Sequence, residues 1–146
     1  MAEPFYRDSH KRGRSDKPAI QVMNPETRLH IAIAKDLEWL IPTEVQWSTF
    51  PAGNVKLPPR VGGLLKDMGL KTGWPDIILV HAGSVFGMEL KAGKGPLSAS
   101  QKDRHPLLIA AGMKIAVCRS IDDVLAALAD WGIPIRISKP ASVPPA

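Results

Sequence analysis

The sequence predicts a mixed α/β domain, on the basis of three observations. Helix-period apolar patterns alternate with short runs of β-branched residues, in the order helix, strands, helix, strand, helix. Two of these short runs are separated only by a small turn that contains glycine, which is typical of a hairpin. The length of 146 residues fits one domain with a buried core, without room for a second domain beside it.

The first half of the chain is expected to hold two helices and a strand. The first helix should follow Asn24 and end before Pro42, with an apolar face formed by Leu29, Ile33, Leu37 and Leu40. Residues 43–50 should form a short strand. After a loop, a second short helix is expected over residues 61–68, and Gly69 should stop it.

The second half is expected to begin with the hairpin. Its elements should be, in chain order, a strand over 76–80, a turn at 82–84, a returning strand over 85–91, a helix from Ser98, a strand over 114–119 and a helix over 120–131 closed by Gly132. Because Pro106 lacks an amide hydrogen and restricts His105, the helix from Ser98 should kink there or begin a new segment. As lone histidines, His105 and His81 are expected to be surface or capping residues.

The two ends of the chain differ in composition from the rest. Residues 1–19 contain the basic run His10-Lys-Arg-Gly-Arg14 without apolar periodicity, and we expect an arm that either touches phosphates or is inert. Residues 138–146 are rich in proline, which neither continues a helix nor donates to a sheet, so a frayed tail is expected. The folded domain should therefore span residues 20–137.

The charge, the hydropathy and the cysteine content of the chain indicate which partners and which cell compartment to expect. Lysine plus arginine outnumber aspartate plus glutamate by 19 to 14, a net charge of +5, which suits a polyanionic partner but also fits a merely basic protein. No run approaches the roughly 18 apolar residues of a membrane span, and no apolar signal core is present, so we expect neither insertion nor export. The single cysteine, Cys118, lies in an apolar run and is expected to be buried in a protein of the reducing cytoplasm.

Three charged residues lie where the hairpin would bring them together. Residues two apart on a strand share a face, so Glu89 and Lys91 should point one way while Met88 and Leu90 point into the core. If Asp76 begins the adjacent strand, its carboxylate reaches the same space. Two convergent carboxylates, with the carbonyl of Leu90 as a further oxygen, suit a hard cation such as Mg²⁺.

Such a site is suited to phosphodiester hydrolysis. A bound divalent ion offsets charge on the phosphate and activates water, and Lys91 would orient that water or stabilise the transition state. By itself, however, a Glu-x-Lys pattern on a strand also fits an ordinary ion-paired sheet in an unrelated basic protein. The Pro75-Asp76 step before an apolar strand and the glycine loop after Lys91 favour the site.

Several ordered segments carry a family resemblance. They are Gly73-Trp-Pro-Asp-Ile-Ile-Leu79, Met88-Glu-Leu-Lys-Ala-Gly93, Leu97-Ser-Ala-Ser-Gln101, Ala111-Gly112 and Val117-Cys-Arg-Ser120. Together, over about residues 26–131, they resemble the VRR-NUC family, the virus-type replication-repair nucleases of the PD-(D/E)xK superfamily. Upstream, Phe50-Pro-Ala-Gly-Asn54, Arg60, Leu65-Lys66 and Gly69 resemble stand-alone members from phages and bacteria.

The resemblance implies a restriction-endonuclease-like fold and a Mg²⁺- or Mn²⁺-dependent nuclease. Asp76 and Glu89 would be metal ligands, with the Leu90 carbonyl beside them, and Lys91 the catalytic lysine. Glu26 would be the first-helix glutamate that holds the metal's water shell. Gln101 matches the family's helical glutamine near the site. His30 departs from the pattern, because the family more often has glutamine there.

Two of these residues also have structural interpretations. Ser98-x-x-Gln101 is a capping box, in which the glutamine side chain reaches back to the cap amide, and this does not exclude a role in the site. Glu26 lies in the first turn of a helix, where the helix dipole favours an acid.

The resemblance further implies a stand-alone endonuclease for branched or flapped DNA, such as a Holliday junction or a flap, that acts as a homodimer in the cytoplasm of a bacterium or a phage-infected cell. DNA phosphates are expected to contact Arg60, Lys66, Lys71, Lys94, Lys102 and Arg104. The rival interpretation is a catalytically silent nucleic-acid-binding module on the same fold. Intact Asp76, Glu89 and Lys91 argue against it, because converging acids repel DNA in the absence of a metal.

Overall fold

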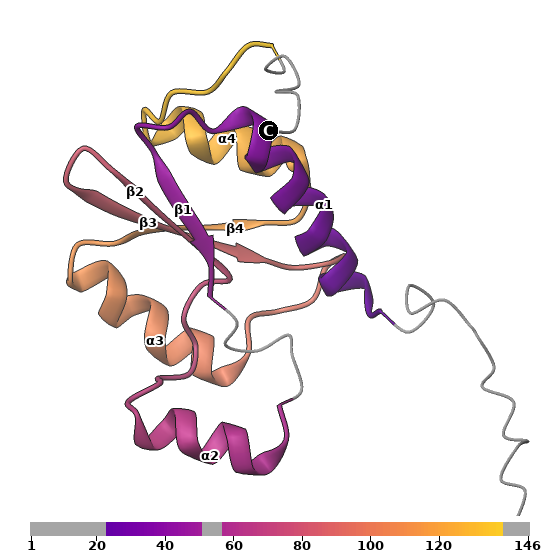
Figure 1. Cartoon of the computed structure of the whole chain (residues 1–146), viewed down its shortest axis with the longest axis vertical. Helices are drawn as coiled ribbons and strands as arrows, with labels where there is room; N and C mark the ends of the chain where they lie inside the picture. Colours follow the sequence, from indigo (N-terminus) through magenta and orange to yellow (C-terminus); the bar gives the residue numbers. More distant parts are fainter. Residues whose placement is uncertain (1–22, 51–56, 139–146) are drawn as a thin grey trace, which may run out of the picture.

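The computed structural model describes residues 23–50 and 57–138, and it confirms the mixed α/β fold (Figure 1). The elements in chain order are α1 (Pro25–Leu40), β1 (Gln46–Thr49), α2 (Pro59–Asp67), β2 (Ile77–His81), β3 (Ser84–Leu90), α3 (Ala99–Ala110), β4 (Lys114–Cys118) and α4 (Ile121–Asp130). The predicted basic arm, most of the loop after β1 and most of the proline-rich tail lie outside the described residues. No helix in the described ranges combines the length and apolar character needed to cross a membrane.

The four strands form one sheet in the order β1-β2-β3-β4. The first three strands are antiparallel, and β4 runs parallel to β3. Strands β2 and β3 are joined by the two-residue turn Ala82–Gly83, in which both residues have positive φ, 46° and 79°. A two-residue turn of this kind matches the twist of the strands and fixes their register, in which Ile77 lies opposite Met88.

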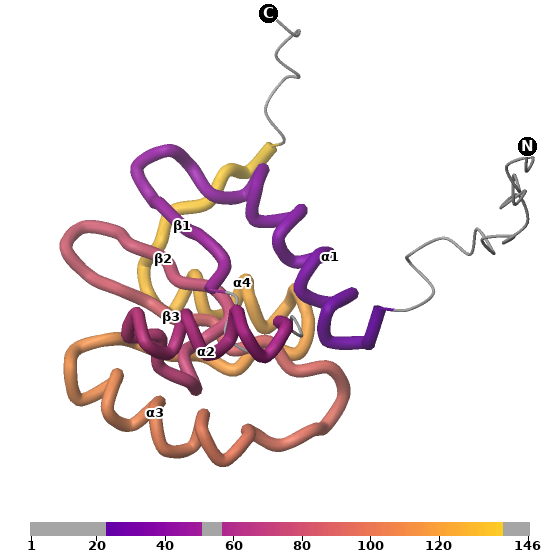
Figure 2. Tube along the Cα trace, turned by 60° about the horizontal axis from the view of Figure 1, so that its bottom comes forward, coloured from indigo at the N-terminus to yellow at the C-terminus, as the bar shows by residue number. Residues whose placement is uncertain are grey.

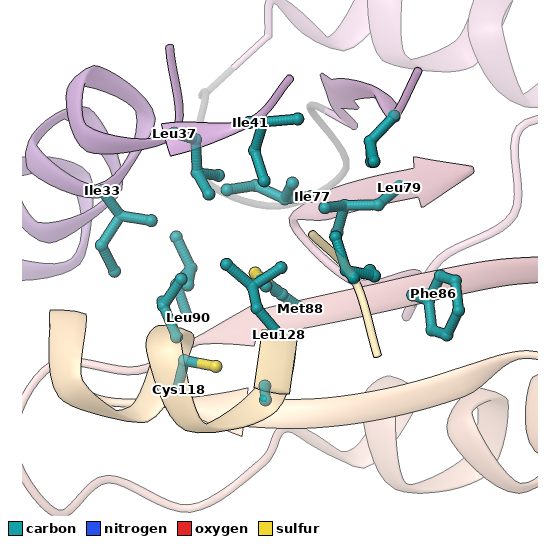
Figure 3. Close-up of a cluster of buried hydrophobic side chains, with 14 residues drawn as sticks. Ile33, Leu37, Ile41, Ile77, Leu79, Phe86, Met88, Leu90, Cys118 and Leu128 are labelled. Atoms are coloured by element: carbon teal, nitrogen blue, oxygen red, sulfur yellow. The ribbon is translucent and has the colours of Figure 1, made fainter. Parts of the chain in front are cut away.

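Helices α1 and α4 cover one face of the sheet and form the core with it. Figure 3 shows Ile33 and Leu37 of α1 turned toward Met88 of β3 and Leu128 of α4, and all four are almost fully buried. Cys118 belongs to the same core, and its burial raises the pKa of the thiol to about 11. The predicted apolar face of the first helix and the buried cysteine are thus confirmed.

Helices α2 and α3 lie on the other side of the sheet from α4 (Figure 1), and Figure 2 brings this side forward. Helix α3 buries His105 and Leu108 against the sheet, whereas α2 buries no residue. On the face opposite to Met88, Glu89 is buried under α3, and Gly87 is buried under the ring of Pro75. Strand β3 is therefore covered on both faces.

Some element boundaries differ from those predicted. The β1 strand begins at Gln46, not residue 43, because the Pro42 carbonyl accepts from the Val45 amide and closes a turn there. Helix α2 begins at Pro59, two residues earlier than predicted, since proline is favourable at a helix start. Helix α3 continues through Pro106 as one segment, so of the two expected alternatives, a kink or a new segment, the new segment is excluded. Packing of its buried face against the sheet offsets the backbone cost of the proline, about 3 kcal/mol.

Candidate active site

The hairpin register brings Asp76 beside Glu89. Asp76 directly precedes β2, and its Oδ2 accepts a hydrogen bond of 2.8 Å from the amide of Leu90. The side chains of Asp76, Glu89 and Lys91 all lie on the α3 side of the sheet, since they alternate with core residues. Asp76 is 7%, Glu89 1% and Lys91 7% exposed, so three ionisable residues share a largely buried space.

The first turn of α3 contacts the carboxyl group of Glu89. The Nε2 of Gln101 donates to Oε1 of Glu89 over 2.7 Å. The same glutamine completes the capping box, because its Oε1 accepts from the Ser98 amide at 2.8 Å while Ser98 Oγ accepts from the Gln101 amide. The capping box is thus confirmed, and helix capping orients the same side chain that contacts Glu89.

His105 faces the second oxygen of the same carboxyl. Its Nε2 lies 3.3 Å from Oε2 of Glu89, and the residue is only 6% exposed. The expectation that His105 is a surface or capping residue is therefore wrong. Within the described part of the chain, neither Nε2 nor Oε2 has a hydrogen-bond partner, because the two atoms are close but not aligned for a hydrogen bond. His81 is half-buried at the far end of β2, with its Nδ1 also unpartnered among these residues.

Burial changes the protonation of this cluster. Desolvation, with the charge of Asp76 second, raises the pKa of Glu89 to about 8, and the nearby Lys91 only partly opposes this. Desolvation also lowers the pKa of His105, against the opposing effect of Asp76. Without a cation, Glu89 therefore tends to keep its proton at neutral pH, although its neighbours are arranged around a carboxylate.

Helix α1 reaches the site at two positions. Oε1 of Glu26, in its first turn, lies 4.0 Å from Nζ of Lys91. One turn later, Nε2 of His30 lies 2.9 Å from Oγ1 of Thr49, which donates to the backbone carbonyl of Asp76 at 3.2 Å. His30 thus contacts the site through Thr49, at the position where the sequence departs from the family pattern.

The basic residues predicted to contact phosphates differ in exposure and in contacts. Arg60, Lys66, Lys71, Lys94 and Lys102 are exposed. Arg104 is half-buried and donates from Nε to the carbonyl of Thr72, in the loop that leads to Asp76. Arg119, which the sequence analysis did not single out, donates from Nη1 to the carbonyl of Gly93 in the glycine loop after Lys91.

Glycines provide the space in which Pro75 and Asp76 are placed. A Cβ on Gly87 would lie 2.6 Å from Cγ of Pro75, so the proline ring occupies the position of the missing side chain. Gly73, with φ of 83°, packs directly against the backbone of Ser100 in α3. The Pro75-Asp76 motif is therefore fixed between β3 and the start of α3.

The residues present fit a divalent cation in part. The two carboxyls of Asp76 and Glu89 are close, one Glu89 oxygen lies buried without a hydrogen-bond partner within residues 23–50 and 57–138, and oxygen donors suit Mg²⁺ or Mn²⁺. Over the same ranges, no group of three or more His, Cys, Asp or Glu side chains is gathered as a ligand set. Glu26 therefore does not join the two acids as a third direct ligand in this arrangement, and is engaged with Lys91.

No protein-family model and no curated protein sequence matches this chain. Among solved structures, a protein described as "VRR_NUC domain protein" is similar to it, with a TM-score of 0.55 and 18% sequence identity. The similarity covers 76% of this chain and 91% of that chain. At this identity it establishes the fold, and it confirms the fold that the sequence resemblance predicted.

Proposed function

We propose that this chain is a divalent-metal-dependent nuclease that hydrolyses phosphodiester bonds in DNA. The observation that carries the proposal is the buried meeting of Asp76 and Glu89 beside Lys91, with the pKa of Glu89 raised to about 8. Two adjacent buried carboxyls are unfavourable in a purely structural role, and a bound cation removes the conflict. The similarity of the fold to a VRR_NUC domain protein supports the same function.

In this proposal Asp76 and Glu89 hold the metal ion, and the Leu90 carbonyl and the water shell near Glu26 complete its surroundings. When bound, Mg²⁺ or Mn²⁺ supplies positive charge to the phosphate and lowers the pKa of a coordinated water. Gln101 keeps Oε1 of Glu89 in place through its 2.7 Å hydrogen bond. The Leu90 amide does the same for Oδ2 of Asp76.

Lys91 supplies the positive charge that belongs to the protein itself. Its ammonium lies on the same face as Glu89 and is 4.0 Å from Oε1 of Glu26, which keeps it directed toward the site. There it would stabilise the negative charge that develops on the phosphate oxygens.

The substrate in this proposal is DNA in a branched or flapped form, cut by a homodimer, as the sequence resemblance implies. Lys94, in the glycine loop, and Lys102, in the first turn of α3, are exposed next to residues that contact Glu89 or follow Lys91. Such contacts position the DNA backbone and carry no sequence information.

The test is a cleavage assay on labelled duplex, single-stranded, flap and four-way-junction DNA, with Mg²⁺, Mn²⁺ or EDTA. We expect metal-dependent cleavage by the wild type, and a loss of about 10²-fold or more in Lys91→Ala, because charge stabilisation is removed from the reacting phosphate. Lys35→Ala, at an exposed position of α1 away from the site, is the matched control and should cleave normally. DNA binding without cleavage of any substrate would instead favour the silent binding module.

A further inference from the structure

Helix α3 presents two polar side chains to one carboxyl group. Gln101 and His105 are four residues apart and therefore lie on the same face of the helix. Gln101 donates to Oε1 of Glu89 at 2.7 Å, and Nε2 of His105 lies 3.3 Å from Oε2. Each oxygen of Glu89 thus has its own partner position on α3.

The environment of His105 is costly for a residue that only packs. It is 6% exposed, and its Nε2 is buried without a hydrogen-bond partner among the described residues. A buried polar group left unsatisfied costs about 1–3 kcal/mol, whereas an aliphatic side chain at the same place would carry no such cost. Oε2 of Glu89 is unsatisfied in the same way within the described ranges, so the two unpaired atoms face each other.

We propose that His105 is a positioning residue, which holds the second oxygen of Glu89 in the orientation that metal binding requires. This inference rests on the proposed function. With hydrogen on Nε2, the imidazole donates to Oε2 after a small rotation of either side chain. Each carboxylate oxygen has two lone pairs, so Glu89 can accept from both α3 residues and still offer oxygen to a cation.

In this arrangement both oxygens of the Glu89 carboxylate are fixed by side chains of α3. A single donor, Gln101, leaves the group free to turn about the bond that carries the carboxyl, whereas two donors from one rigid helix do not. Partners that orient a metal ligand in this way typically change metal affinity by about 10- to 100-fold when they are removed. The role of His105 is thus to preorganise Glu89 without itself touching the ion or the substrate.

The test is direct Mn²⁺ binding, measured by calorimetry and by the electron paramagnetic resonance of free Mn²⁺, in the full chain without DNA. His105→Leu removes the donor with a similar volume and should raise the Kd for Mn²⁺ by about 10- to 100-fold. His105→Gln places a donor near the position of Nε2 and should bring the Kd back to within about threefold of wild type. If the leucine variant fails to fold by circular dichroism, His105→Met takes its place.

His81→Leu is the matched control, because His81 also has a buried ring nitrogen without a partner among the described residues, at the opposite end of β2 from Asp76. It should leave the Kd unchanged. Equal Kd values for wild type and His105→Leu, or equal losses in the leucine and glutamine variants, would overturn the inference while leaving the nuclease proposal intact. Absence of Mn²⁺ binding by the wild type would overturn both.

Discussion

The folded protein favours the protonated form of Glu89, whereas the proposed metal binding requires its carboxylate. Glu89 is 1% exposed, accepts a hydrogen bond from Gln101 and lies beside Asp76. In the absence of a cation, burial and the neighbouring Asp76 disfavour its charged form. The free energy of unfolding of the metal-free protein should therefore depend on pH through the protonation of this carboxyl group.

The prediction for Glu89→Gln follows from the raised pKa. In the unfolded chain Glu89 loses its proton near its ordinary value of 4.5, but in the folded protein it keeps the proton up to about 8. Between these values the folded state binds the extra proton, so this group makes the wild type less stable as pH rises. Glutamine imitates the protonated form, and the variant should gain on the order of 2–4 kcal/mol by pH 8 in EDTA, with no gain near pH 4.

Urea unfolding of both proteins between pH 4 and pH 8.5 measures this difference. Glu44→Gln, at an exposed position in the turn before β1, is the control and should show no such pH dependence. A stability difference between Glu89→Gln and wild type that is constant over the whole range would contradict the raised pKa. Saturating Mn²⁺ should reduce the advantage of the variant, because only the wild type keeps the full ligand set.

Residues whose contacts follow from local periodicity could be predicted, and those that depend on packing between elements could not. Asp76, Glu89 and Lys91 were found because strand alternation and a short turn determine which side chains meet. The contact of Thr49 with His30 depends on how an edge strand meets α1, and nothing in the sequence indicates it. His105 had a usable signal, its spacing of four from Gln101, but as a lone histidine it was expected to be a surface or capping residue.

At the scale of elements, the loop between α2 and β2 determines where Asp76 lies. Gly73 in this loop adopts φ of 83° and packs against the backbone of Ser100, while Arg104 of α3 donates to the neighbouring Thr72 carbonyl. The loop is therefore attached to the same helix that holds Glu89. The overall order of helices and strands followed from apolar patterning, but this attachment required the three-dimensional arrangement.

We expect Gly73→Ala to destabilise the protein by about 3 kcal/mol, from backbone strain at positive φ and from overlap with Ser100. Gly69→Ala is the matched control: its φ is 102°, but nothing lies within 4 Å of the added Cβ. It should carry only the conformational part, about 1 kcal/mol. Equal losses for the two variants in urea unfolding would show that the contact with α3 contributes nothing.

At the scale of the whole molecule, charge is nearly balanced in the part that the structure describes. Residues 23–50 and 57–138 contain 12 lysines and arginines and 11 aspartates and glutamates, although the full chain carries +5. The immediate site holds three acids, Glu26, Asp76 and Glu89, beside Lys91. DNA binding by this domain should therefore depend on where the basic residues lie and on a cation at the acids, because net charge alone gives little attraction.

This leads to a prediction for the salt dependence of DNA binding. Each phosphate contact contributes about 0.9 to the slope of log K against log salt concentration, so the double variant Lys94→Ala, Lys102→Ala should lower that slope by about 2. Fluorescence anisotropy with duplex DNA, in a Lys91→Ala background to prevent cleavage, measures it between 50 and 200 mM salt. Lys35→Ala, exposed on α1, should leave the slope unchanged. An equal decrease in that control would mean that DNA binding depends on the general charge of the protein. The proposed phosphate contacts of Lys94 and Lys102 would then be wrong.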